Sequence, residues 1–324
     1  MSKNLTYFFE SVLFTLLLSF AVVLAVDRTL TLSVSKGISL WAVSVLPALF
    51  PYFFITAILS ALSVTEKLSN FISPLTKKVF NVGGSVGYAF IISLLSGYPV
   101  GAKTVADLKN NNLISESESV RASAICSTSS PMFLMGSVGN IMFNSTLFGL
   151  LLFLSQLISS VLIGIIFSFY KRSDKPSREK NLHRAKTTDN ILYDSVFSSV
   201  ISVLTVGGLI TVFYLATDLL SKTKLLCPLE WLFTLILGEE SGQAFTFGLI
   251  ECTRGLQFLS QSGITGLALP LSSALCGFGG FCVITQSIAI LKSAKIKTAP
   301  FLYSKVLSAV LNFTISLILS FIFF

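Results

Sequence analysis

The sequence predicts an all-α polytopic membrane protein with about seven crossings and two re-entrant helical hairpins, arranged as two inverted repeats. Of its 324 residues, 53% are hydrophobic and only 12% are charged, and the mean hydropathy is +0.82. A soluble domain carries about twice that share of charged residues. The apolar runs last about 20 residues or more, the length of a membrane helix and roughly twice that of a barrel strand.

The first 170 residues alternate long and interrupted apolar segments. Residues 5–26 are expected to form an uncleaved transmembrane helix, since they lack the small-residue cleavage site of a signal peptide, the alternative. The next span, 38–60, contains Pro47 and Pro51, which predict a kink. An amphipathic interfacial segment, a hairpin, a broken span and a plain span are expected to follow at 64–80, 84–113, 118–143 and 146–170.

After a basic loop, the same order of elements recurs. A span, a short amphipathic segment, a hairpin, a broken span and a plain span are expected at 192–220, 226–238, 240–262, 264–294 and 299–322. A hairpin makes no net crossing, so each half crosses three times and the second is inverted, as in many secondary transporters. The expected organisation is an N-terminal transmembrane helix, a first repeat, the loop and a second repeat: 1–34, 35–170, 171–190 and 191–324.

The basic residues predict the orientation of the chain. With the N-terminus in the cytoplasm, sixteen lysines and arginines lie on the cytoplasmic side and four on the other, while Lys103, Arg254 and Lys305 stay inside helices. This bias predicts a cytoplasmic N-terminus and an external C-terminus. The net charge is +8, but nearly a third of the basic residues lie in one stretch, Lys171 to Lys186, without interleaved aromatic residues, so nucleic-acid binding is not expected.

Four breaks interrupt the helices, at 96–101, 127–131, 251–255 and 277–280. Unwound backbone at membrane depth must line a cavity or be buried in protein. Each break is followed by an expected helix start, near Ala102, Pro131, Leu256 and Phe281. Four helix N-termini aimed at the membrane centre predict an anion site.

Two basic residues next to the hairpin breaks, Lys103 and Arg254, strengthen this prediction, because charges inside a membrane are costly and mark functional sites. Their alternative role is internal pairing, with Asp107 and Glu251 respectively. The serine-rich break is interpreted as facing solute or an ion, whereas the glycines at 277–280 suit close helix packing equally well. The candidate substrate-binding residues are Gly97, Tyr98, Pro99, Gly101, Lys103, Ser127, Thr128, Ser129, Ser130, Glu251, Thr253, Arg254, Gly279 and Gly280.

Catalysis is not predicted. The sequence contains no HExxH, GxSxG or P-loop motif, a single histidine, His183, and five cysteines without paired spacing. No catalytic residue, metal site or cofactor is therefore expected, and an ATP-driven pump is excluded.

The residues at the breaks resemble a known family. SGYPVGAK at 96–103, STSSP at 127–131, GSVG at 136–139, ECTRG at 251–255 and GFGG at 277–280 are similar to the YlbJ family of sporulation integral membrane proteins, which carry the nucleoside-recognition Gate domain. The resemblance covers about residues 35–324. It implies a fold similar to concentrative nucleoside transporters, and translocation of dipicolinic acid, a small aromatic dianion, from the mother cell toward the forespore.

The leading functional prediction is a transporter or facilitator of a small organic anion, dipicolinic acid foremost, in the cell membrane or the outer forespore membrane. The expected partners are the anionic solute and the lipid bilayer, with further copies of the chain or sporulation membrane proteins as additional candidates. The alternatives are a nucleoside or nucleobase transporter and a non-transporting scaffold of a sporulation complex. A nucleoside site would favour amide and carboxylate ligands over Lys103 and Arg254, and a scaffold would tolerate neutral substitutions at both.

Overall fold

The computed structural model describes residues 27–61, 64–171, 190–261 and 266–323, and every regular element in these ranges is helical. The first half contains α2 (Arg28–Leu40), η1 (Trp41–Val45), α3 (Leu46–Ala61), α4 (Val64–Phe80), α5 (Gly84–Ser96), α6 (Val100–Asn110), α7 (Glu116–Ile125), η2 (Met132–Met142) and α8 (Thr146–Ser168). The second half contains α9 (Ile191–Lys222), α10 (Cys227–Leu237), α11 (Glu239–Ile250), α12 (Cys252–Gln261), α13 (Ala268–Phe278), α14 (Gly280–Ser293) and α15 (Ala299–Phe323).

The two halves follow one order of elements. The continuous run α2–η1–α3 corresponds to α9, the short α4 to α10, the pair α5–α6 to α11–α12, the pair α7–η2 to α13–α14, and the plain helix α8 to α15. This is the order expected from the sequence, with all four helix breaks present. The inverted relation between the halves stays a prediction.

The long apolar helices confirm a polytopic all-helical membrane protein. Among the described residues, five helices are long and apolar enough to cross a membrane, or six if the pair Leu68–Phe80 and Gly84–Ser96, bent by 94°, is a single span. The five are Arg28–Leu59, Thr146–Ser168, Ile191–Lys222, Ala268–Ser293 and Ala299–Phe323. The expected first span, 5–26, and nearly all of the basic loop lie outside the described residues, so the total of seven crossings stays a prediction.

The span expected to begin at residue 38 begins ten residues earlier, at Arg28, so the expected domain boundary at 34/35 falls inside α2. The Asp27 side chain caps this helix by accepting the N–H of Thr29 at 2.8 Å, a start signal that the hydropathy pattern does not contain. The π-helical segment η1 lies just before Pro47, and Pro51 lies inside α3, while the kink expected from the two prolines stays a prediction. A proline cannot bond the carbonyl four residues back, and a π-helical turn accommodates that loss.

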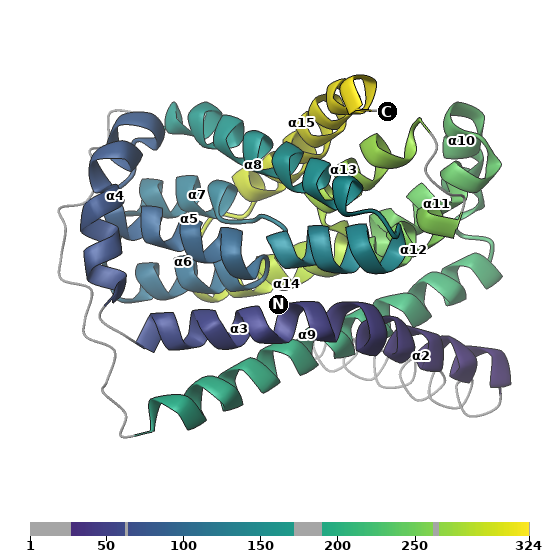
Figure 1. Cartoon of the computed structure of the whole chain (residues 1–324), viewed down its shortest axis with the longest axis horizontal. Coiled ribbons are helices and arrows are strands. Elements are labelled where there is room, and N and C mark those ends of the chain that lie inside the picture. Colours follow the sequence, from purple (N-terminus) through teal and green to yellow (C-terminus); the bar gives the residue numbers. More distant parts are fainter. Residues whose placement is uncertain (1–26, 62–63, 172–189, 262–265, 324) are drawn as a thin grey trace, which may run out of the picture.

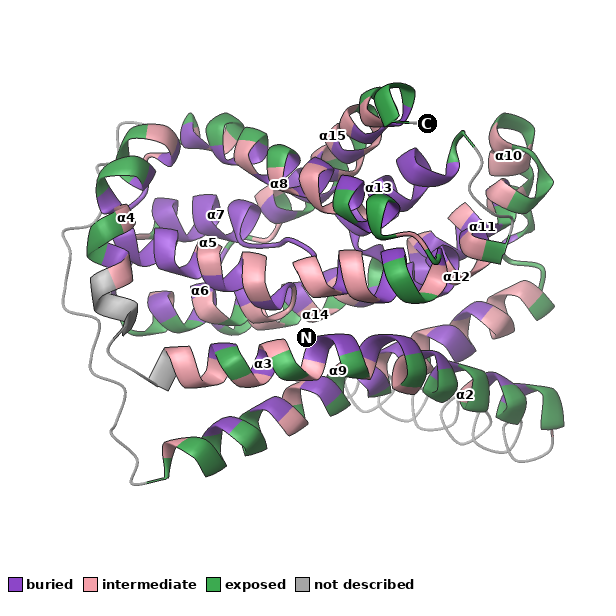
Figure 2. Cartoon of the chain, in the orientation of Figure 1, coloured by how far each residue is buried: buried purple, intermediate pink, exposed green. Residues whose placement is uncertain are grey.

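The helices form layers around the breaks. In Figure 1, α2 and α3 run beside α9 along one side, the broken pairs lie in the middle, and α8 and α15 lie on the opposite side. Figure 2 shows α5, α7 and α13 almost wholly buried, while α2, α9 and α10 carry exposed outer faces. The breaks therefore lie inside the protein, as unwound backbone at membrane depth requires.

Small residues let α9 approach its neighbours closely. A Cβ added to Gly37 would lie 3.0 Å from the Cα of Thr211, and one added to Gly207 would lie 2.5 Å from the indole ring of Trp41. Glycines at such crossings are typical of membrane helix packing, where close backbone approach replaces the hydrophobic driving force.

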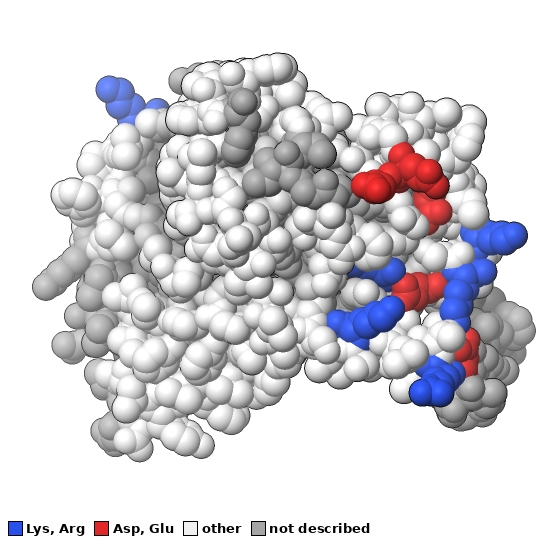
Figure 3. All heavy atoms as spheres, turned by 45° about the vertical axis from the view of Figure 1, so that its right-hand side comes forward, with Lys and Arg blue, Asp and Glu red and all other residues white. Residues whose placement is uncertain are grey.

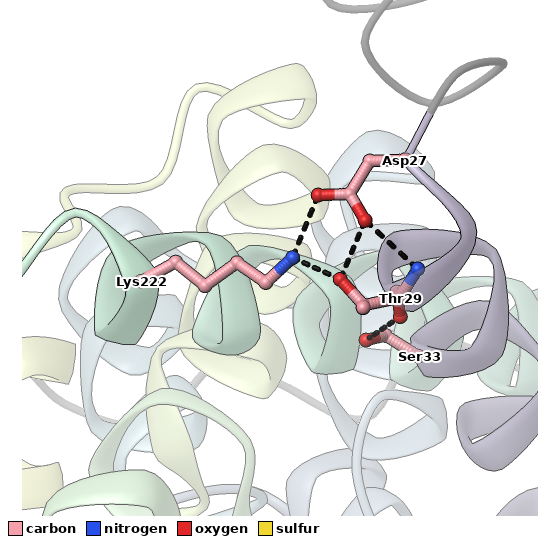
Figure 4. Close-up of polar contacts among 4 residues, drawn as sticks. All are labelled: Asp27, Thr29, Ser33 and Lys222. Carbon is pink, nitrogen blue, oxygen red and sulfur yellow. Dashed lines mark hydrogen bonds and ion pairs between the residues drawn. The ribbon is translucent and has the colours of Figure 1, made fainter.

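A polar clamp joins the start of α2 to the end of α9 (Figure 4). The Lys222 ammonium donates to the Asp27 carboxylate at 2.7 Å and also contacts the Thr29 hydroxyl. Hydrogen bonding by Lys222 holds the pKa of Asp27 well below its usual range. The clamp is partly exposed, as expected for charges at the end of a membrane helix.

Charged side chains gather at one end in the view of Figure 3, around the start of α2, the end of α9 and the turn between α10 and α11. The broad face beside them is almost free of charge in this view. A face almost free of charge beside a charged end agrees with helices that cross a bilayer.

Candidate functional site

The α5–α6 break is built on glycines. Gly97 has φ +78°, a conformation that favours glycine, and a Cβ on it would lie 2.9 Å from the backbone nitrogen of Ser130. A Cβ on Gly101 would overlap the carbonyl oxygen of Cys126. The two glycines therefore bring this break directly against the break that follows α7, where the Tyr98 N–H donates to the Thr128 carbonyl at 2.9 Å.

The serine-rich break joins α7 to η2 at residues 126–130, where the sequence predicts it. The Ser130 hydroxyl accepts the N–H of Phe133 at 3.2 Å, so Ser130 and the following proline start η2 as expected. Thr128 turns to α5 and donates to the Ser93 carbonyl at 3.1 Å. Ser129 turns the other way and donates to the Tyr98 hydroxyl at 2.8 Å.

The break between α11 and α12 is a single residue. Glu251 is extended, and its carboxylate accepts the N–H groups of Thr253 at 3.1 Å and Arg254 at 2.7 Å. The helix after this break therefore starts at Cys252 and not near Leu256, as the sequence analysis expected. The expected start is wrong because the buried carboxylate caps the helix and so holds its first turn in helical form.

The break between α13 and α14 consists of two left-handed glycines, Gly279 with φ +84° and Gly280 with φ +72°. A Cβ on Gly280 would lie 3.0 Å from the backbone nitrogen of Cys252. These residues serve backbone conformation and close packing, the role that the sequence analysis weighed equally with solute contact.

The breaks meet at a central cavity of about 50 Å³, enough for a few water molecules. Tyr98 connects the first half of the chain to the second, because its hydroxyl donates to the Cys276 carbonyl at 3.2 Å. Of the candidate residues, seven line this cavity: Gly97, Tyr98, Pro99, Ser129, Ser130, Glu251 and Thr253. They come from three separate breaks, at 97–99, 129–130 and 251–253, so this cavity lies where the two halves of the chain meet.

Lys103 does not line the central cavity. It is exposed on α6 and lines a second cavity of about 280 Å³, together with Asp107 and Asp194. This larger cavity lies between α3, α6 and the first turns of α9.

Arg254 also points away from the central cavity. Its guanidinium pairs with Asp218 of α9 at 2.5 Å and donates to the Tyr214 carbonyl at 3.0 Å. The guanidinium carbon lies 4.2 Å from the centre of the Tyr214 ring and 4.5 Å from that of Phe247. The side-chain partner is therefore Asp218, while Glu251, the partner considered from the sequence, bonds only the backbone N–H of Arg254.

Lys305 of α15 is a buried cation next to the breaks that was not among the candidate residues predicted from the sequence. It is 1% exposed, and its ammonium donates to the Ser127 carbonyl at 3.1 Å and lies 5.0 Å from the centre of the Tyr98 ring. No carboxylate pairs with it among the residues that the structure describes. The sequence does distinguish Lys305, because this lysine is the lone charged residue within the apolar span 299–322, and a charge inside a membrane span marks a candidate functional residue.

This arrangement defines a polytopic membrane protein with the fold of a concentrative nucleoside transporter. The solved structure of a double variant of CNTnw in an outward-facing state is similar, with a TM-score of 0.58 over 96% of this chain and 84% of that chain. The sequence identity is 12%, so this likeness shows the fold alone.

Sequence comparison gives the particular relatives. Residues 42–172 match the family model Gate, described as nucleoside recognition. The sporulation integral membrane protein YlbJ of Bacillus subtilis (strain 168) is 29% identical over 300 residues, which cover 85% of this chain and 73% of that protein. The resemblance to YlbJ-like proteins with a Gate domain is thereby confirmed.

Proposed function

We propose that this protein is a membrane transporter or facilitator of a small organic anion, and that dipicolinic acid, moved from the mother cell toward the forespore, is its substrate. The observation that carries the proposal is the convergence of three helix breaks on one central cavity, whose lining residue Tyr98 has the buried Lys305 ammonium 5.0 Å from the centre of its ring. Broken helices around a central cavity are how secondary transporters build solute sites within the membrane.

Electrostatics favours an anion at this cavity. The helices α6 and α14 start at breaks and have no side-chain cap, whereas Ser130 caps η2 and Glu251 caps α12. Uncapped first-turn N–H groups attract carboxylates. Lys305 adds a buried positive charge 5.0 Å from the centre of the Tyr98 ring. A small aromatic dianion would supply two carboxylates to these groups.

The name of the relative supports a role in sporulation and a place in a membrane. The name of YlbJ connects that protein with sporulation. By extension, we place this chain in the cell membrane or the outer forespore membrane. The distribution of basic residues supports a cytoplasmic N-terminus and an external C-terminus.

A nucleoside or nucleobase is the second candidate solute. The matched family model is described as nucleoside recognition, and the cavity lining includes Glu251, Thr253 and Gln286, side chains that can hydrogen-bond an uncharged base or ribose.

Equilibrium binding distinguishes the two solutes. Radiolabelled dipicolinate and a set of labelled nucleosides would each be dialysed against the purified full chain in detergent, with heat-denatured protein as the control. We expect saturable binding of dipicolinate that unlabelled nucleosides do not displace. Saturable nucleoside binding without dipicolinate binding would transfer the assignment to the second candidate, and binding of neither to folded protein would favour the scaffold.

A further inference from the structure

We infer that the second cavity is the vestibule through which solute reaches the central cavity, and that the hydrogen bond between Ser96 and Thr56 closes the passage between them. This inference rests on the proposed transport function. Its test needs no solute, so the path and the substrate assignment can fail separately.

The two cavities are consecutive along the same pair of helices. On α3, Leu49 lines the central cavity and Phe53, one turn further along, lines the second. On α9, Val206 lines the central cavity and Ser202, one turn back, lines the second. The two cavities therefore lie one after the other along α3 and α9.

The α5–α6 hairpin forms the shared third wall. Ser96 and Pro99 line the central cavity, while Val100 and Lys103 line the second. Because neighbouring residues of the break, Pro99 and Val100, line different cavities, a small movement of the break would connect the two cavities.

A buried side-chain hydrogen bond crosses this boundary. The hydroxyl of Ser96, which lines the central cavity, donates at 2.8 Å to the hydroxyl of Thr56, which lines the second cavity. Both side chains are buried, at 1% and 4% exposed, and Thr56 donates in turn to the Tyr52 carbonyl at 2.8 Å. One buried hydrogen bond is weak enough to open by thermal motion and strong enough to favour the closed state.

The lining of the second cavity suits passage of a hydrophilic solute. Lys103, Asp107 and Asp194 provide charges of both signs, and the α9 wall carries Ser195, Ser198, Ser199 and Ser202. A polar wall of mixed charge keeps the space hydrated without holding one ion tightly. We therefore assign the second cavity to passage of the solute and the central cavity to its specific recognition.

The chain contains its own reporters. Cys282 lines the central cavity and is 2% exposed. Cys227 is exposed at the start of α10, at the opposite end of α9 from the second cavity (Figure 1). A charged, membrane-impermeant thiol reagent would be added to sealed vesicles of each orientation, and modification of each cysteine would be read by peptide mass spectrometry.

With reagent on the face opposite Cys227, we expect Cys282 to react about three to ten times faster in Thr56→Val and in Ser96→Ala than in the parent, the change that losing one hydrogen bond gives. Thr56→Ser keeps the hydroxyl and should react at the parent rate. Thr246→Val is the matched control, because Thr246 also bonds its own helix, at 2.8 Å to the Gly242 carbonyl, but lines neither cavity. Unchanged Cys282 labelling in both variants, or an increase only from the face that labels Cys227, would overturn the inference.

Discussion

Replacing Lys305 by methionine is expected to leave the protein folded and to weaken dipicolinate binding about tenfold or more, a loss of about 1.4 kcal/mol. The ammonium donates to the Ser127 carbonyl at the break and lies 5.0 Å from the centre of the ring of Tyr98, which lines the cavity, so its removal takes away both a hydrogen bond at the break and a buried positive charge next to Tyr98. Methionine has a similar length, and an unpaired charge is costly to bury, so the fold should not lose stability. Thermal unfolding and equilibrium dialysis of the same preparations measure the two effects.

Lys36→Met is the matched control for Lys305→Met. Lys36 is an exposed cation on α2 and lines neither cavity, so its replacement removes the same net charge without touching the breaks. Parent-like binding by a folded Lys305→Met variant would contradict the role of Lys305. Equal weakening by Lys36→Met would show that only the overall charge matters.

Replacing Arg254 by methionine is expected to destabilise the protein by about 3 kcal/mol, the lower end of the range for breaking a buried ion pair. The loss arises because Asp218, with its side chain 22% exposed, keeps a partly buried charge without its partner. The double variant Arg254→Met/Asp218→Asn should recover most of the stability, since neither charge remains. Thermal unfolding of the parent, both single variants and the double variant forms the cycle that measures this coupling.

The same double variant decides between the two roles considered for Arg254. If the guanidinium only joins α12 to α9, the stable double variant binds dipicolinate as the parent does. A double variant that is stable and has lost binding would support the anion contact predicted from the sequence. A single variant as destabilised as the double variant would contradict the proposed coupling.

The breaks are predictable from sequence because their signals are local. A Gly-Tyr-Pro string cannot continue a helix, and serine followed by Pro131 marks the start of a new one. The left-handed conformations of Gly279 and Gly280 follow from the same rule, since glycine adopts them without steric cost. Composition and apolar run length likewise predict the membrane class and nearly all the helices.

The side-chain partners are not predictable in this way, because they depend on packing between distant segments. Arg254 meets Asp218 from 36 residues away, and Lys305 meets Ser127 from 178 residues away. The pairs predictable from sequence are therefore only those within one helical turn, Lys103 with Asp107 and Arg254 with Glu251. From the sequence, Lys103 and Lys305 both lie inside helices, whereas in the fold Lys103 is exposed and Lys305 is buried.

Flux into proteoliposomes shows whether the protein transports dipicolinate. Liposomes that contain the parent chain would be compared with protein-free liposomes, first with a dipicolinate gradient alone and then with added proton or sodium gradients. We expect saturable uptake in the first preparation only, reduced about tenfold or more by Lys305→Met. Uptake that equals that of protein-free liposomes under every gradient, with the reconstituted chain shown to be folded, would contradict the account.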